Sequence, residues 1–191
     1  MAVESLADIT LTRFCFKNNN DFVKAISKFN KKFGYNFKET EIEENPALYF
    51  LDKDNNIYIS YLKGKIKFRK PYEHIEEIEI LKEISTNFIK DNSTDFMALA
   101  FDFLKTFTDS PSINLRFNQV AFKDDEIKYK KTAKLVNDED DNIIGATMNF
   151  HFYNFDTVTK TKIDAINLIL NSIITNIDTY INEFEESVKV G

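Results

Sequence analysis

Apolar residues of this 191-residue chain follow two spacings, which alternate along the sequence. In residues 21–33 they recur every three or four positions, the spacing of one face of an α-helix. Gly34 follows, and glycine is the residue that most readily takes the left-handed conformation found just after a helix. We therefore predict a helix from Asp21 to Phe33 whose buried face is formed by Phe22, Ile26, Phe29 and Phe33.

Shorter segments of the first half alternate apolar and polar residues, as in strands with one buried face. Residues 52–56, Asp-Lys-Asp-Asn-Asn, are a polar run between two such segments and predict a hairpin loop. Pro71 lacks the N–H that a sheet ladder needs, so we expect the sheet to stop there. The predicted strands cover residues 9–16, 35–44, 48–51, 57–62 and 65–69.

Helical spacing returns in the middle of the chain, where we predict helices at residues 72–90 and 96–107. The second of these helices is expected to bury Phe96, Leu99, Ala100, Phe103, Leu104 and Phe107. The pattern then predicts further strands and one long C-terminal helix, at residues 112–118, 127–136 and 143–153 and at about 159–188.

This order of elements, β-α-β-β-β-α, α, β-β-β-α, is typical of an α+β fold. We expect two antiparallel sheet segments with helices packed on one face. Residues 1–191 are expected to form a single domain, in which two halves of similar type (about 1–90 and 91–191) share one core. No repeat of individual residues links the halves.

The C-terminal helix carries apolar residues at alternating intervals of three and four, the heptad spacing of a helix that faces a partner helix. One interpretation places this row on the protein's own sheet. The other places it in a homodimer interface, which Ile173→Asp should break without unfolding the monomer. The row consists of Ile163, Ile166, Leu170, Ile173, Ile177, Tyr180 and Phe184.

A basic strand is the main candidate for contact with an anion or a nucleic acid. Lys63, Lys65, Lys67 and Arg69 share one face of the predicted strand, and Lys70 follows them. Such a stripe can follow a phosphate backbone. Two alternatives require no ligand: an edge strand protected by lysines, or ion pairs with the acidic helix that follows.

Composition narrows the range of functions. Net charge is −6, whereas proteins that wrap duplex DNA are normally basic. The four glycines are too scattered for a phosphate-binding loop, and the single cysteine, Cys15, precludes an intramolecular disulfide or a cysteine-rich zinc site. The first residues lack the pattern of a signal peptide. We expect a cytoplasmic protein that uses no cofactor.

Candidate chemistry is sparse. His151 lies on the polar side of a predicted strand, and Asp52, Asp54 and Asn56 resemble the start of a calcium loop that lacks its glycine and its final carboxylate. We assign no catalytic, cofactor-binding or metal-binding residue. The sequence favours a non-enzymatic protein-binding module that acts as a regulator, inhibitor or adaptor. The alternatives are a nucleic-acid-associated protein that uses residues 63–70, and an enzyme whose site is not recognisable.

Overall fold

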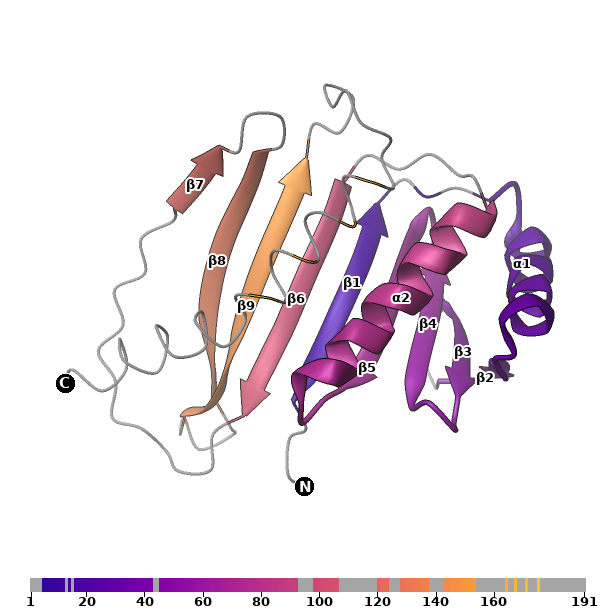
Figure 1. Ribbon diagram of the computed structural model, residues 1–191, viewed down its shortest axis with the longest axis horizontal. Helices are drawn as coiled ribbons and strands as arrows, with labels where there is room; N and C mark the ends of the chain where they lie inside the picture. The colour runs from indigo at the N-terminus through magenta and orange to yellow at the C-terminus, as the bar shows by residue number, and fades with distance from the viewer. Residues whose placement is uncertain are drawn as a thin grey trace.

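The computed structural model describes residues 5–153, except 13, 15, 43–44, 93–97, 107–119, 124–127 and 138–142, together with residues 164, 167, 171 and 175. These residues form nine strands and two helices (Figure 1). In chain order the elements are β1 (Leu6–Thr12), α1 (Asn19–Phe33), β2 (Lys38–Thr40), β3 (Leu48–Asp52), β4 (Ile57–Leu62), β5 (Lys65–Pro71), α2 (Ile75–Asn92), β6 (Ala98–Thr106), β7 (Val120–Lys123), β8 (Lys128–Asn137) and β9 (Ile143–Tyr153).

All described strands belong to one sheet, in the order β2-β3-β4-β5-β1-β6-β9-β8-β7. Each described pairing is antiparallel. The predicted α+β class with antiparallel sheet is therefore confirmed. The two expected sheet segments are joined into one sheet because β1 pairs with β5 on one side and with β6 on the other.

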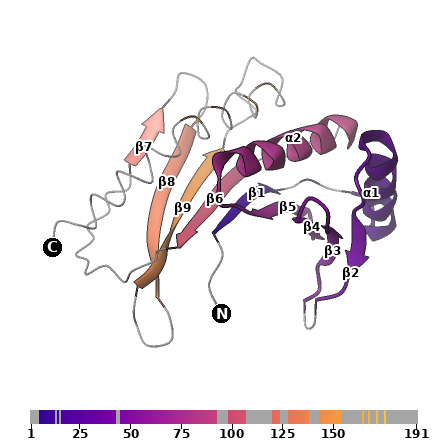
Figure 2. The ribbon, with the colours of Figure 1, turned by 60° about the horizontal axis from the view of Figure 1, so that its bottom comes forward.

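Both helices lie on the same side of the sheet (Figure 2). Helix α2 packs across β1 and β5 and also contacts α1. This arrangement gives the described part of the sheet one face that is covered by helices and one face, which we call the open face, that neither helix covers (Figures 1 and 2).

Helix α1 forms where the sequence predicts it. The Asn18 side chain accepts a hydrogen bond from the Asp21 N–H at 3.0 Å and so caps the first turn. At the other end Gly34 has a φ of 76°, and its N–H donates to the Asn30 carbonyl at 2.9 Å. A residue with a Cβ would be strained in that conformation. The predicted helix and its glycine end are confirmed.

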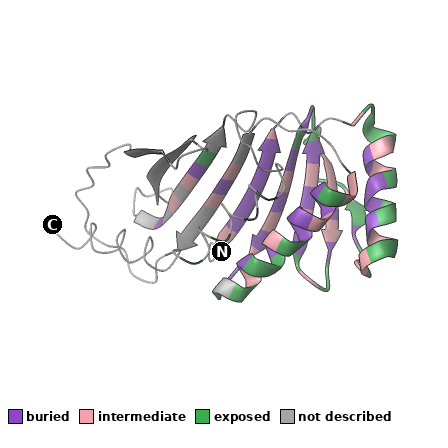
Figure 3. Cartoon of the chain, turned by 45° about the horizontal axis from the view of Figure 1, so that its top comes forward, coloured by how far each residue is buried: buried purple, intermediate pink, exposed green. Residues whose placement is uncertain are grey.

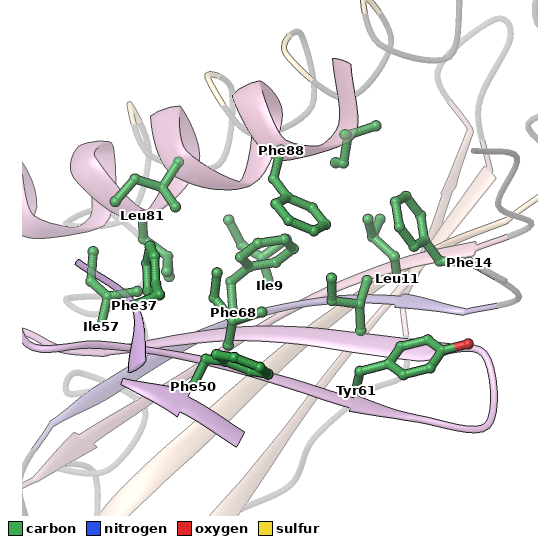
Figure 4. Packing of buried hydrophobic residues seen from close by; sticks show 14 of the residues in the cluster. Ile9, Leu11, Phe14, Phe37, Phe50, Ile57, Tyr61, Phe68, Leu81 and Phe88 are labelled. Carbon is green, nitrogen blue, oxygen red and sulfur yellow. The ribbon is translucent and has the colours of Figure 1, made fainter. Parts of the chain in front are cut away.

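The core between the helices and the sheet is built largely from phenylalanine (Figure 4). Phe88 of α2 lies at its centre, with ring centroids 5.2 Å from Phe29 and 5.7 Å from Phe68. Phe14 and Phe22 lie 6.3 Å from the same ring. Since these five rings come from α1, α2, β5 and the segment after β1, the cluster ties the helical layer to the sheet.

The predicted helix at residues 96–107 is wrong, because Ala98–Thr106 form β6. This strand pairs along its length with β1 and β9, so its backbone groups have sheet partners on both sides. Phe101 is fully buried, whereas Ala100 and Asp102 are only partly buried. The apolar residues of a short segment can fit the spacing of a helix or that of a strand. Here pairing with strands distant in the sequence stabilises the extended form.

Other boundaries also differ from the prediction. The strand expected at residues 35–44 is limited to Lys38–Thr40, and β7 at Val120–Lys123 was not predicted. Residues 164, 167, 171 and 175 are helical, and Lys82 of α2 donates to the Asn171 side chain at 2.6 Å. The rest of the predicted C-terminal helix, and the strand predicted at residues 112–118, lie outside the described residues.

Candidate binding surface on the open face of the sheet

Along β5, buried residues alternate with exposed or partly buried ones, and similar alternation is seen along neighbouring strands of the sheet (Figure 3). Ile66 and Phe68 are fully buried beneath the helices. Lys65 is exposed, and Lys67 and Arg69 are partly buried; these three alternate with the buried pair and therefore lie on the open face. The predicted common face of Lys65, Lys67 and Arg69 is the open face.

This face is hollowed over β3, β4 and β5. The concavity has a volume of about 630 Å³. Polar side chains make up much of its lining, and Leu6, Ile42, Ala47, Leu62 and Pro71 add apolar surface. Its main polar and aromatic side chains are Tyr49, Tyr58, Ser60, Lys65, Lys67 and Arg69.

A carboxylate on the neighbouring strand holds the arginine of this surface. Arg69 donates from Nε to Asp8 Oδ1 at 2.7 Å and from Nη2 to Asp8 Oδ2 at 2.8 Å. Lys67 Nζ lies 3.5 Å from the same carboxylate, whose side chain is only 11% exposed. The pairing is bidentate, the geometry in which an arginine–carboxylate pair is strongest. Arg69 is therefore held in place by the fold.

The polar row continues across the sheet. Asp8 lies opposite both Arg69 of β5 and Asp102 of β6, and Asp102 lies opposite Asn149 of β9. The Asn149 amide donates to the Asp102 carboxylate. Burial raises the pKa of Asp102, and the nearby Asp8 adds to the rise, whereas the Asn149 hydrogen bond, Lys67 and His151 oppose it. The centre of the open face thus carries two carboxyl groups beside two cations.

The structure also bears on the two ligand-free explanations of the basic strand and supports neither. Strand β5 lies between β4 and β1, so the explanation as an edge strand is wrong. The described ion pairs of Lys67 and Arg69 are with Asp8 of β1 rather than with the acidic helix. Asp8 was not singled out in the sequence. Its only signal there is that it is the one charged residue of β1.

The two remaining residues of the predicted basic stripe lie elsewhere. Lys63 is exposed in the turn between β4 and β5, where it has a φ of 45°. Lys70 is 6% exposed on the opposite face of β5, and its ammonium group donates to the Asn55 carbonyl at 2.6 Å. Lys63 is absent from the described lining of the concavity, and Lys70 holds the β3–β4 hairpin.

In the acidic hairpin between β3 and β4, the carboxylate of Asp52 accepts hydrogen bonds from nearby residues of the same chain. Asp52 is 1% exposed and accepts hydrogen bonds from the backbone N–H groups of Asn36, Asp54 and Asn55 at 3.0, 3.0 and 3.2 Å, and from the Asn55 side-chain amide at 3.0 Å. Burial alone would raise the pKa of Asp52, but these hydrogen bonds outweigh it and lower the pKa. The hairpin predicted at residues 52–56 is confirmed, and Asp52 serves as its anchor.

Other candidate features give the following results. His151 is exposed on β9, next to the buried Phe150. No group of three or more His, Cys, Asp and Glu residues that could hold a metal ion occurs among the described residues. Within that same part of the chain, no helix is long and apolar enough to cross a membrane.

Two other features of the sequence analysis lie outside the described residues. One is Cys15. The other is the whole proposed self-association row: Ile163, Ile166, Leu170, Ile173, Ile177, Tyr180 and Phe184.

Comparison with solved structures includes a weak likeness. No family model and no curated protein matches the chain. The solved structure of Methanococcus jannaschii TBP is 12% identical to it, and the alignment covers 90% of this chain and 95% of that one with a TM-score of 0.29. A TM-score this low establishes neither a shared fold nor a shared function.

Proposed function

We propose that this protein is a non-enzymatic binding module that regulates, inhibits or links a protein partner through the open face of its sheet. The observation that carries the proposal is the concavity of about 630 Å³, which holds Lys65, Lys67 and Arg69 beside Tyr49 and Tyr58. Tyrosine and arginine are the residue types most often found at the energetic centre of protein interfaces. Among the described residues, neither helix covers this surface.

The mixture of charges on this face favours a protein partner. Lys65 and Lys67 can pair with carboxylates, while Asp8 and Asp102 can accept hydrogen bonds from N–H donors. A polypeptide carries both carboxylates and N–H groups, whereas a phosphate backbone carries only anions.

Nucleic acid is the second candidate, and one observation supports it. Tyr49 and Tyr58 are partly buried side chains of the same concavity as the three cations. Aromatic rings beside a basic groove are the arrangement that binds single strands by stacking. The net charge of −6 works against this candidate, because long-range attraction of nucleic acid requires positive charge.

An enzymatic function receives less support from the geometry. The acidic side chain that was a candidate ligand in the sequence, Asp52, is engaged by four hydrogen bonds within its own hairpin. His151 is exposed, whereas a general base works within hydrogen-bond reach of a bound substrate.

Affinity capture from native host lysate tests the proposal. The wild-type chain should recover a specific protein at near-physiological salt, with or without nuclease treatment. A Lys65→Glu/Lys67→Glu variant should lose that protein. Lys24→Glu is the matched control, because Lys24 is exposed on α1 and lies away from the open face.

The outcomes separate the two candidates. Recovery that disappears after nuclease treatment would replace the protein partner with nucleic acid. Recovery that survives the double lysine change but is lost with Lys24→Glu would move the binding surface to α1.

A further inference from the structure

We infer that the open-face concavity receives an extended acidic segment of a partner protein, with carboxylates at alternate residues that pair with Lys65 and Lys67. This inference rests on the proposed function and specifies the chemistry of the partner. Three observations support it: the spacing of the cations, the difference in how closely each cation is paired with Asp8, and the side chains that surround them.

The cations repeat at the spacing of an extended chain. Lys65, Lys67 and Arg69 are alternate residues of one strand and lie on one face of it. Alternate residues of a strand are roughly 6.5–7 Å apart along its axis. An extended peptide presents its own alternate side chains at the same repeat, so acidic residues at positions i and i+2 match two neighbouring cations of β5. Adjacent acidic residues would point to opposite sides of the peptide.

The three cations are not equally available. Two guanidinium N–H groups of Arg69 are engaged by Asp8 at 2.7 and 2.8 Å. Lys67 lies farther from that carboxylate, at 3.5 Å, with a side chain 36% exposed. Lys65 is exposed, and no ion pair of its ammonium group is found within the described part of the chain. Two lysines are therefore left for an incoming pair of carboxylates, while Arg69 mainly holds Asp8.

The surroundings suit a peptide rather than a small anion. Ile42 and Leu62 line the concavity and are 44% and 36% exposed, an exposure that few large apolar side chains of the described residues reach. Tyr49 and Ser60 are directly opposite each other on β3 and β4, in the same row as Lys67. An extended segment can pack apolar side chains against Ile42 and Leu62. It can also form hydrogen bonds with the hydroxyl groups of Tyr49 and Ser60.

Fluorescence anisotropy with two labelled synthetic peptides tests this inference. One peptide alternates Glu and Thr, and the other has the same length and composition with Glu in adjacent pairs. The alternating peptide should bind about fivefold more tightly, the effect of one additional favourable ion pair. Lys65→Glu and Lys67→Glu should each weaken its binding by about fivefold or more, and Lys24→Glu should leave it unchanged.

A charge swap makes the test specific to the surface. The Lys67→Glu variant should bind a peptide of alternating Lys and Thr more tightly than the wild type does. Circular dichroism of each variant should match the wild type, because Lys65 and Lys67 are not in the apolar core.

Each remaining outcome overturns the inference in an identifiable way. Equal affinity for the two acidic peptides, lost in both lysine variants, would overturn the spacing and leave the open-face binding function standing. Tighter binding of oligothymidylate than of either peptide would replace the acidic segment with a single-stranded nucleic acid. Failure of both peptides to bind, while lysate capture still depends on Lys65 and Lys67, would overturn the acidic segment but not the proposed function.

Discussion

Asp8 of β1 and Asp102 of β6 lie directly opposite each other where the two central strands pair, and different groups stabilise them. Asp8 accepts two hydrogen bonds from the Arg69 guanidinium. Asp102 accepts one from the neutral amide of Asn149. The strands that join the two sides of the sheet therefore bring two carboxyl groups together, and only part of that negative charge is matched by the guanidinium of Arg69.

The Arg69–Asp8 pair should contribute measurably to folding. Arg69→Leu leaves a mostly buried carboxylate with only Lys67 near it, and we expect a loss of about 2 kcal/mol in the free energy of unfolding. This value lies below that of a fully buried pair because the Arg69 side chain is 42% exposed. Urea denaturation measures it. Lys67→Met, which removes the longer contact, should cost less than about 1 kcal/mol, and equal losses for the two variants would contradict this account of Asp8.

Asp102 should make stability fall as pH rises. Its pKa in the folded protein is raised above the ordinary value of 3.8, so the folded state binds this proton more tightly than the unfolded state does. The stability that the proton provides is complete below pH 3.8 and is lost as pH rises through the raised pKa. Asp102→Asn cannot ionise and can still accept from Asn149, so the variant should be more stable than the wild type at neutral pH.

Comparing the two proteins across pH isolates this effect, because Asp52, Glu77 and Asp91 have lowered pKa values and act in the opposite direction. Urea denaturation at several pH values gives the difference in stability between wild type and Asp102→Asn. A difference that does not grow with rising pH would show that Asp102 is not the titrating group.

Asp52 should have the opposite pH dependence. Its hydrogen bonds favour the carboxylate, so its contribution is present above the ordinary pKa of 3.8 and is lost as pH falls through the lowered pKa. Asp52→Ala removes the acceptor of three backbone N–H groups and should cost about 2–3 kcal/mol at neutral pH, measured by urea denaturation. Asp54→Ala is the control, because Asp54 is exposed and contributes its backbone N–H. Similar losses for both variants would contradict the anchoring role of Asp52.

Phe88 should be among the most sensitive core positions. Its ring contacts those of Phe14, Phe22, Phe29 and Phe68, so Phe88→Ala opens a cavity where α1, α2 and the sheet meet. We expect a loss of about 3–5 kcal/mol, measured by thermal or urea unfolding, and a smaller loss for Phe88→Leu. Ile80→Ala on the same helix is the control, because Ile80 is 40% exposed and should cost less than about 1 kcal/mol.

Local signals predicted elements well where they were unambiguous. The stripe of Phe22, Ile26 and Phe29 with Gly34 after it defined α1. The alternation of basic and apolar residues over positions 65–69 defined β5. Residues 98–106 fall within a segment that was predicted as a helix. Their apolar spacing fits the helical repeat of three to four residues as well as the strand repeat of two, so the pattern alone could not distinguish the two forms. Their extended form depends on pairing with β1 and β9, which are distant in sequence, and no local pattern reports that pairing.

The candidate surface, too, could be predicted from the sequence only in part. Period-two spacing was enough to place Lys65, Lys67 and Arg69 on one face. The partner of Arg69 could not be predicted, because Asp8 lies 61 residues away and meets it only through the β1–β5 pairing. The role of Lys70 depends in the same way on the fold of the β3–β4 hairpin, whose Asn55 carbonyl accepts its hydrogen bond.

Lysine footprinting tests the central claim, that the open face is the binding surface, most directly. Acetylation of surface lysines is measured by mass spectrometry for the free chain and for the chain bound to the partner captured from lysate. The account predicts that Lys65 and Lys67 lose reactivity on binding, while Lys24 and Lys28 on α1, both exposed, keep theirs. Unchanged reactivity of Lys65 and Lys67 together with protection of Lys24 would contradict it.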